Sequence, residues 1–126
     1  MAMLQPIPSA VIKAVSDARA LSEREVATRL LEMLGPTLTT AIGDAKDTRA
    51  ARQWAAGRHC YRANALRAAL LATVAIAANY EAEGARSWFA STNPDLDWRS
   101  PLVFIRAAVQ QEQLDRLVQV AAQDAR

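Results

Sequence analysis

Few side chains in this sequence belong to the types that perform catalysis. One histidine, His59, and one cysteine, Cys60, are present, and they are neighbours in the chain. A metal cage takes about four protein or water ligands, and a nucleophile needs a base beside it, so this pair is too small a set for either. No glycine-rich phosphate loop is found, and helix capping explains the scattered serines and acids. We therefore predict no enzyme, no catalytic residues, no metal and no cofactor.

Charge points instead to binding. The 126 residues carry 15 Lys and Arg against 13 Asp and Glu, a net charge of +2. Residues 46–67 hold six basic groups and the single acid Asp47, whereas the rest of the chain holds nine basic and twelve acidic groups. A basic segment in a mildly acidic protein indicates local contact with an anionic partner. The six basic residues are Lys46, Arg49, Arg52, Arg58, Arg62 and Arg67.

A second unusual stretch is WFASTNPDLDWRSP, residues 88–101, which holds two of the three Trp and two of the five Pro. Its aromatic rings bury large apolar areas, and its two X-Pro steps interrupt helices, so it predicts a rigid corner. The corner could simply cap and connect helices, or its rigidity could lower the entropy cost of docking a partner. Trp98 follows a charged residue and is the best candidate for an exposed anchor, whereas Trp88 and Leu102 are expected in the core.

Helical periodicity supplies the elements that must hold these residues, and no strand pattern is present. A hydrophobic content of 52%, rich in alanine, with few Gly and Pro, predicts an all-α domain. A capping box at Ser22 and Glu25 begins a helix that Gly35-Pro36 ends. The other expected helices cover residues from 9 onward, 36–43, 48–56, 62–83, 85–91 and 101–123, with a break at Gly84 and 62–83 as the central helix.

Residues 36–56 have the pattern of a helix-turn-helix. Two short helices are joined by the turn at residues 44–46, and the second has buried-type residues on one face and polar, basic ones on the other. Arg and Gln suit guanine and adenine edges in the major groove, so operator DNA is a candidate partner. The alternative is a packing or dimerisation unit with solvated arginines. The candidate DNA-binding residues are Arg49, Arg52, Gln53 and Arg58.

In order along the chain, these features resemble one family of bacterial proteins. They are DTRAARQWAAG at residues 47–57, a long Ala/Leu helix, the aromatic pair at 88–89, and NPDLDWRSPL at 93–102. This pattern is similar to the MbcA/ParS/Xre group of antitoxins over about residues 34–109. The Trp-then-Gly ending of the helix-turn-helix is moderately specific, and the aromatic pair combined with NPxL and RxPL is much more so.

The resemblance implies an all-helical antitoxin of a type II toxin-antitoxin system, whose partner is a RES-domain toxin that degrades NAD. In that family the C-terminal domain covers the toxin's active site, and the C-terminal end of the chain contributes to the block. Six residues match the family's toxin-binding motif, and we add Trp98 and Arg126 to them. The candidate toxin-binding residues are Trp88, Asn93, Leu96, Trp98, Arg99, Pro101, Leu102 and Arg126.

The last 26 residues offer chemistry for blocking a pocket that normally holds an anionic dinucleotide. Carboxylates could occupy the places where basic toxin residues would hold phosphate, unless they only solvate a helix face. The residues considered are Val109, Glu112, Asp115, Leu117, Val118 and Asp124. Two features depart from the family: residues 97–98 stand where small glycines are common, and the usual glycine between the last two helices is missing.

The prediction is therefore a non-enzymatic antitoxin with three regions: an N-terminal helical extension at 1–33, a helix-turn-helix at 34–61, and a central helix with a toxin-binding domain at 62–126. The alternative is a stand-alone helix-turn-helix regulator whose C-terminal helices only dimerise. No apolar run is long enough to cross a membrane and the first ten residues lack a secretion signal, so we expect a cytoplasmic protein. We also expect a homo-oligomer.

Overall fold

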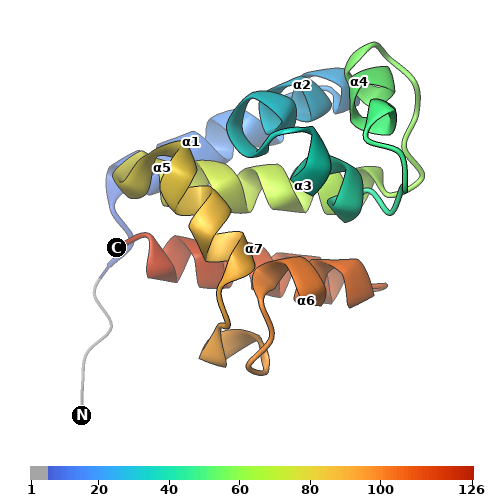
Figure 1. Cartoon of the computed structure of the whole chain (residues 1–126). Helices are drawn as coiled ribbons and strands as arrows, with labels where there is room; N and C mark the ends of the chain where they lie inside the picture. Colours follow the sequence, from blue (N-terminus) through green and yellow to red (C-terminus); the bar gives the residue numbers. More distant parts are fainter. Residues whose placement is uncertain (1–5) are drawn as a thin grey trace.

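The computed structural model describes residues 6–126, and within that range the chain is helical (Figure 1). The described residues form no strand, apart from one isolated bridge between Asn93 and Arg99, so the predicted all-α class is confirmed. No helix in the described range is long and apolar enough to span a membrane. The elements are α1 (Ser9–Arg19), α2 (Glu23–Leu34), α3 (Pro36–Ile42), α4 (Arg49–Ala55), α5 (Ala63–Ala90), the 3-10 turn η1 (Pro94–Leu96), α6 (Pro101–Ala107) and α7 (Gln111–Asp124).

The long helix α5 lies between two layers of helices, as its apolar character predicts. Every residue from 68 to 76 is buried, because α1 and α2 pack on one side of the helix and α7 on another. Figure 1 shows α1 and α2 above α5, and α6 and α7 below it. A helix that is apolar nearly all round is stable only when it is covered in this way.

The predicted N-terminal extension is an integral part of this core. Val11 and Ala18 of α1 and Leu30 of α2 are buried with residues from every other α-helix in one hydrophobic cluster. Residues 34–61 and 62–126 contribute to the same cluster, so the described parts of the three predicted regions share one core. Residues 1–5 of the predicted extension lie outside the described range.

Local capping follows the sequence closely. Ser22 and Glu25 form the predicted capping box, and Gly35, at φ 87°, separates α2 from α3 in a conformation that glycine adopts without strain. Ser100 accepts a hydrogen bond from the Val103 backbone N–H at 3.2 Å, and Pro101 begins α6. The two ends of α2 and the start of α6 are therefore fixed by residues at the helix termini.

The break in the central helix lies at Glu81 and not at Gly84, so that prediction is wrong. Glu81 has φ 60° and ψ −179°, which is a strained conformation for a residue with a side chain. On the N-terminal side of the break, the Asn79 amide and the Tyr80 hydroxyl donate to backbone carbonyls of Ala125 and Arg126. The end of α7 thus binds the helix where it kinks.

Gly84 has a packing role instead of a breaking one. The helix continues through it, and a Cβ at this position would come within 2.5 Å of the Tyr80 Cβ. A glycine therefore allows the helix to resume directly after the kink, which is a tertiary reason that helix propensity alone does not reveal.

The connection between α3 and α4 is also longer than predicted. It covers residues 43–48, twice the length of the predicted turn at 44–46. Gly43 is buried against Trp54, and a Cβ there would lie 2.2 Å from the indole ring. The absence of a side chain at Gly43 lets α4 pack with its Trp inward. At the start of α4, the Asp47 carboxylate accepts a hydrogen bond from the Arg49 backbone N–H at 2.9 Å.

Candidate protein-binding site

The segment between α5 and α6 closes on itself through hydrogen bonds made by Asn93. The Asn93 N–H donates to the Arg99 carbonyl at 3.0 Å, and its own carbonyl accepts from the Trp98 N–H at 3.0 Å. The Asn93 side-chain oxygen accepts from the Asp95 N–H at 2.9 Å, which begins η1, and the Leu96 side chain is buried beneath it. We call residues 93–101 the corner. One asparagine therefore binds backbone groups of three other corner residues, Asp95, Trp98 and Arg99.

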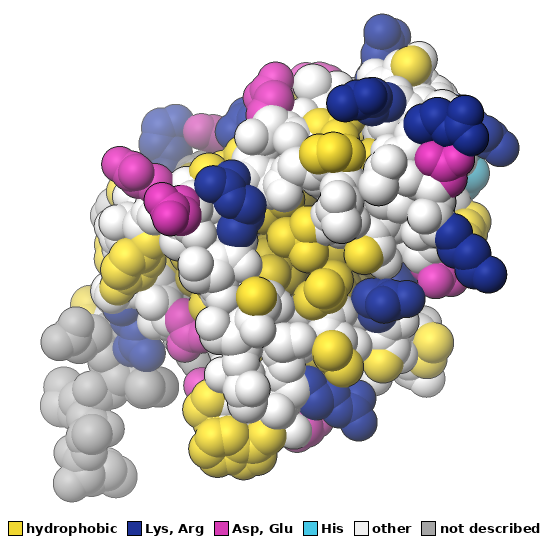
Figure 2. All heavy atoms as spheres, viewed as in Figure 1, with side chains coloured by type: hydrophobic (Ala, Val, Ile, Leu, Met, Phe, Trp, Pro, Cys, Tyr) yellow, Lys and Arg dark blue, Asp and Glu magenta, His cyan; other side chains and the backbone are white. Residues whose placement is uncertain are grey.

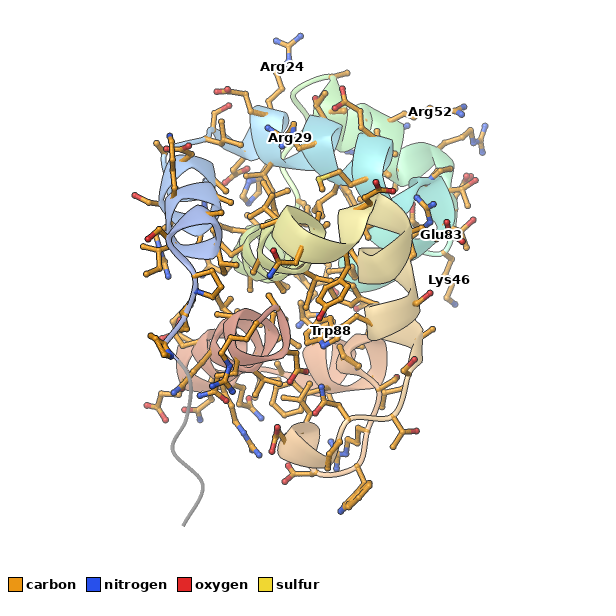
Figure 3. The ribbon with its side chains drawn as sticks, turned by 90° about the vertical axis from the view of Figure 1, so that its left-hand side faces the viewer. Arg24, Arg29, Lys46, Arg52, Glu83 and Trp88 are labelled. Atoms are coloured by element: carbon orange, nitrogen blue, oxygen red, sulfur yellow. The ribbon has the colours of Figure 1, made fainter. Side chains whose placement is uncertain are left out.

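Helix α7 holds the corner in place. Oδ2 of Asp124 accepts from the indole N–H of Trp88 and from the Asn93 amide, both at 2.9 Å. The Arg116 guanidinium donates to the Asp95 carbonyl at 2.7 Å. Figure 3 shows Trp88 between the end of α5 and the layer of α6 and α7. These contacts join Asn93 and Asp95 of the corner to α7.

Two consecutive residues of the corner have left-handed backbone conformations. Asp97 has φ 58° and Trp98 has φ 63°. A positive φ is uncommon for residues other than glycine and is an outlier for a bulky side chain, with a cost of about 1–3 kcal/mol. Glycine adopts such a conformation without strain, so a tryptophan at this position is exceptional.

Trp98 is not packed onto the protein. Its side chain is 72% exposed, which agrees with its prediction as the exposed tryptophan of the three. Figure 2 shows hydrophobic atoms protruding at the lower end of the molecule, where the corner lies in Figure 1. Val103 of α6 is 53% exposed and Val109, between α6 and α7, is 88% exposed. The corner and α6 thus leave apolar side chains in solvent.

The structure separates the eight candidate toxin-binding residues by burial. Leu96 and Pro101 are fully buried and Asn93 is 7% exposed, so in this conformation they can act only by shaping the corner. Trp98 and Arg99 are exposed and able to touch a partner. Trp88, Leu102 and Arg126 are half-buried.

Other predicted contacts of the C-terminal region also belong to the interior. Leu117 and Val118 are buried and do not offer an exposed surface. Asp124 is exposed, but its carboxylate is bound to Trp88 and Asn93. Glu112 and Asp115 remain exposed. Val103 was missed, because its exposure depends on which face of α6 meets the core, and a seven-residue helix gives too short a pattern to show this.

The basic segment at 46–67 is partly consumed inside the fold. The half-buried Arg62 guanidinium donates to the carbonyls of Ile42, Ile105 and Ala108 at 2.7–3.1 Å. Arg67 donates to the carbonyl of Arg19 at 3.3 Å. Two of the six cations are therefore bound to backbone carbonyls of the fold, which leaves four of them for the predicted contact with an anionic partner.

The candidate DNA-binding residues are all exposed, but three of them have partners. Arg49 forms an ion pair with Asp47 at 2.5 Å and holds the pKa of that carboxyl down, at about 2. Arg58 donates to the Gln53 amide oxygen at 2.7 Å. The Arg52 side chain makes no hydrogen bond or ion pair with other residues in the described range, 6–126.

A further cation lies beside α4, although it comes from α2. The Arg24 guanidinium donates to the carbonyl of Ala55 at 3.2 Å, and Figure 3 shows Arg24 and Arg52 projecting from the upper part of the molecule. No local pattern in the sequence groups Arg24 with the cations of α4, because Arg24 precedes this helix by more than twenty positions. Only the packing of α2 on α4 brings Arg24 to it.

The residues first considered for catalysis make ordinary structural contacts. Cys60 is buried, and burial raises the pKa of its thiol. Nδ1 of His59 lies 2.9 Å from Oε2 of Glu23 on the surface. Among residues 6–126, no group of three or more His, Cys, Asp or Glu side chains could hold a metal ion.

Comparison of the chain with protein-family models, with curated protein sequences and with solved structures finds no match. The family resemblance therefore depends on the motifs in the sequence, and the corner is the site with the most distinctive geometry.

Proposed function

We propose that this chain is the antitoxin of a type II toxin-antitoxin system, and that its corner and α6 bind a RES-domain toxin and cover the toxin's NAD-consuming active site. The motifs at residues 47–57 and 88–102 support the family, and the exposed aromatic side chain of the corner supports a protein-binding role. The chain acts by occlusion and catalyses no reaction.

One observation carries the proposal: Trp98 is strained and exposed at the same time. A tryptophan at φ 63° costs the folded chain free energy, and with 72% of the residue in solvent it regains little of that cost by burial. Glycine would fit the backbone better. Tryptophan is also the residue type most enriched among the anchors of protein interfaces. Contact with a partner is the role that offsets this cost.

The surroundings of Trp98 suit a docking surface. The corner is joined to α7 by Asp124 and Arg116, so little conformational entropy is lost when a partner binds. Val103 on α6 and Val109 after it are further exposed apolar residues of this region, and Arg99 adds a charge next to Trp98 in the chain. A rigid aromatic anchor with an apolar border is the arrangement expected at the centre of an interface.

The test is rescue from a RES-domain toxin, sought first in the adjacent reading frame. Cells that express this toxin with the wild-type chain should grow and keep their NAD, whereas cells with Trp98→Ala should lose both growth and NAD. Tyr61→Ala is the matched control, because Tyr61 is also a 72% exposed aromatic residue but lies on the α4 side of the molecule. Equal rescue by both variants, at equal protein levels, would refute the role of Trp98.

Truncation is a poor substitute for these point variants. Removing residues 99–126 would delete α6 and α7, and with them Phe104, Ile105 and Leu117 of the core. Loss of a whole layer of the core is expected to unfold the chain, so a truncated chain that fails to rescue would not identify the contact surface.

A stand-alone DNA-binding regulator is the second candidate, and the outward position of Arg52 on α4 favours it. Arg49→Ala combined with Arg52→Ala should flatten the salt dependence of operator binding if these side chains meet phosphates. Arg106→Ala, which removes an exposed cation from α6, is the control. A regulator without a toxin partner would lose operator binding in the double variant and show no growth defect with Trp98→Ala. An antitoxin that also represses its operon would show both effects.

A further inference from the structure

The end of α7 is held by side chains of another helix. The last carbonyls of a helix have no partner within it, and a last turn that nothing else binds frays. Here the Asn79 amide of α5 donates to the carbonyl of Ala125, and the Tyr80 hydroxyl donates to the carbonyl of Arg126 at 3.2 Å. Ala125 is also fully buried. We call these two hydrogen bonds from α5 the latch.

The turn that the latch closes also carries the acceptor for the corner. Oδ2 of Asp124 accepts from the indole N–H of Trp88 and from the side-chain amide of Asn93, both at 2.9 Å. Fraying of the last turn of α7 would take this carboxylate away and leave the amide of the buried Asn93 without its partner, which costs free energy. The same asparagine closes the corner through its hydrogen bonds with Asp95, Trp98 and Arg99.

The end of α7 therefore bridges the kink of α5. Asn79 and Tyr80 precede the kink at Glu81, whereas Trp88 follows it. In Figure 1 the end of α7, marked C, lies beneath the kinked part of α5. A strained residue persists only where the surrounding contacts hold it, and this bridge is such a contact. Within the described residues, the two latch donors form no hydrogen bond with the corner itself.

We propose that Asn79 and Tyr80 are positioning residues of the corner, and that they act through the end of α7 and Asp124. A closed latch keeps Asn93 bound, and Asn93 keeps the backbone around Trp98 in its docking conformation. A partner that fits only this conformation binds in proportion to the fraction of chains whose latch is closed. The inference rests on the proposed function only for the docking role of the corner, because the coupling is a property of the free chain.

Hydrogen exchange of the free chain, followed for each amide by NMR, tests this coupling without a toxin. The double variant Asn79→Ala/Tyr80→Phe removes both latch donors at exposed positions. It should speed exchange of the Trp98 and Arg99 amides at least about fivefold, because opening of the corner then breaks fewer hydrogen bonds. The Ala45 amide, which is bonded to a carbonyl of α3 and opens without the latch, should keep its wild-type rate.

Arg86→Ala is the matched control for a general loss of stability. Its exposed guanidinium also donates from α5 to a backbone carbonyl, that of Met33 at 2.8 Å, but this bond leads to α2 and not to α7. The Trp98 and Arg99 amides should keep their wild-type rates in this variant. Equal acceleration of these amides in Arg86→Ala would overturn the proposal, and so would wild-type rates in the latch variant.

A double-mutant cycle tests the route through Asp124. Asp124→Ala should speed exchange of the same corner amides, and adding Asn79→Ala/Tyr80→Phe to it should change their rates by less than about twofold, because the latch no longer holds an acceptor for Asn93. Full additivity of the two effects would contradict this route. A chain that shows the coupling but protects no cell from a toxin would contradict the proposed function and leave the latch in place.

Discussion

The corner at residues 93–101 and the basic segment at 46–67 look equally suited to recognition in the sequence, but the fold uses them differently. In the corner, buried Asn93 and Leu96 fix the backbone and leave Trp98 exposed. In the basic segment, Arg62 and Arg67 turn inward to bind carbonyls. The comparison teaches that the residue types of a segment do not tell which of its side chains are left for a partner.

The difference has a physical origin. A guanidinium has five N–H donors and can satisfy several carbonyls at helix ends, so an arginine is as useful inside a helical fold as on its surface. An indole at positive φ has no comparable use inside this fold, since the chain leaves it in solvent. Exposure of an apolar group at an energetic cost therefore indicates function more strongly than a count of charges.

The largest effect should come from the structural arginine. Arg62→Ala removes the donors for three backbone carbonyls, including those of Ile105 and Ala108 at the end of α6, and should lower the free energy of unfolding by about 2–4 kcal/mol. Urea denaturation measures the loss. Arg52→Ala, in the same segment, should change it by less than about 0.5 kcal/mol. Equal effects of the two substitutions would remove the distinction drawn between these arginines.

A smaller loss is expected at the support of the corner. Asp124→Ala leaves the Trp88 indole N–H and the Asn93 amide without their acceptor and should cost about 1–2 kcal/mol. Asp115→Ala, at an exposed carboxylate of the same helix, should cost almost nothing in the same denaturation experiment. If Asp124→Ala behaves like this control, α7 does not hold the corner.

A variant of Glu81 tests whether backbone strain alone identifies a binding residue. Glu81, at φ 60°, lies in the kink of α5, and Glu81→Gly should raise the free energy of unfolding by up to about 1 kcal/mol. Toxin rescue should stay at the wild-type level, because no exposed apolar anchor is removed. Loss of rescue in a stable Glu81→Gly chain would show that the kink also belongs to the binding surface.

The smallest effect concerns the surface ion pair of the basic segment. Folding lowers the pKa of Asp47 from 3.8 to about 2, mainly through its hydrogen bond with Arg49. The stabilisation from this pair is therefore fully present above about pH 4 and is lost as the pH falls through 2. Asp47→Asn should remove this small contribution, seen as a slightly weaker acid dependence of the melting temperature. If the melting temperature of Asp47→Asn falls at low pH as much as that of the wild type, the pair contributes nothing to stability.

Much of the architecture could be predicted because it depends on local chemistry. The capping box at Ser22, the stop at Gly35 and the start at Pro101 involve neighbours in the sequence, and the burial of α5 follows from its composition. The partners of Arg62 lie up to 46 positions away, so no local pattern reveals them. The kink at Glu81 likewise depends on contacts with the end of α7.

The candidate site could be predicted in part for the same reason. The sequence predicted a rigid corner within residues 88–101 and selected Trp98 as the exposed tryptophan, since turn residues and a neighbouring charge are local signals. It could not separate Leu96 and Pro101, which are buried, from Arg99, which is exposed. That separation depends on the docking of the corner against α7.

The central claim is that Trp98 is kept at a strained position for the sake of a partner. The most direct measurement is calorimetric titration of the proposed partner, a RES-domain toxin, with the wild-type chain and with Trp98→Gly, together with a thermal melt of each free chain. Our account predicts that Trp98→Gly melts at the same temperature or higher, because glycine accepts φ 63°, yet binds the toxin at least about tenfold more weakly. A stable Trp98→Gly chain with wild-type affinity would contradict it.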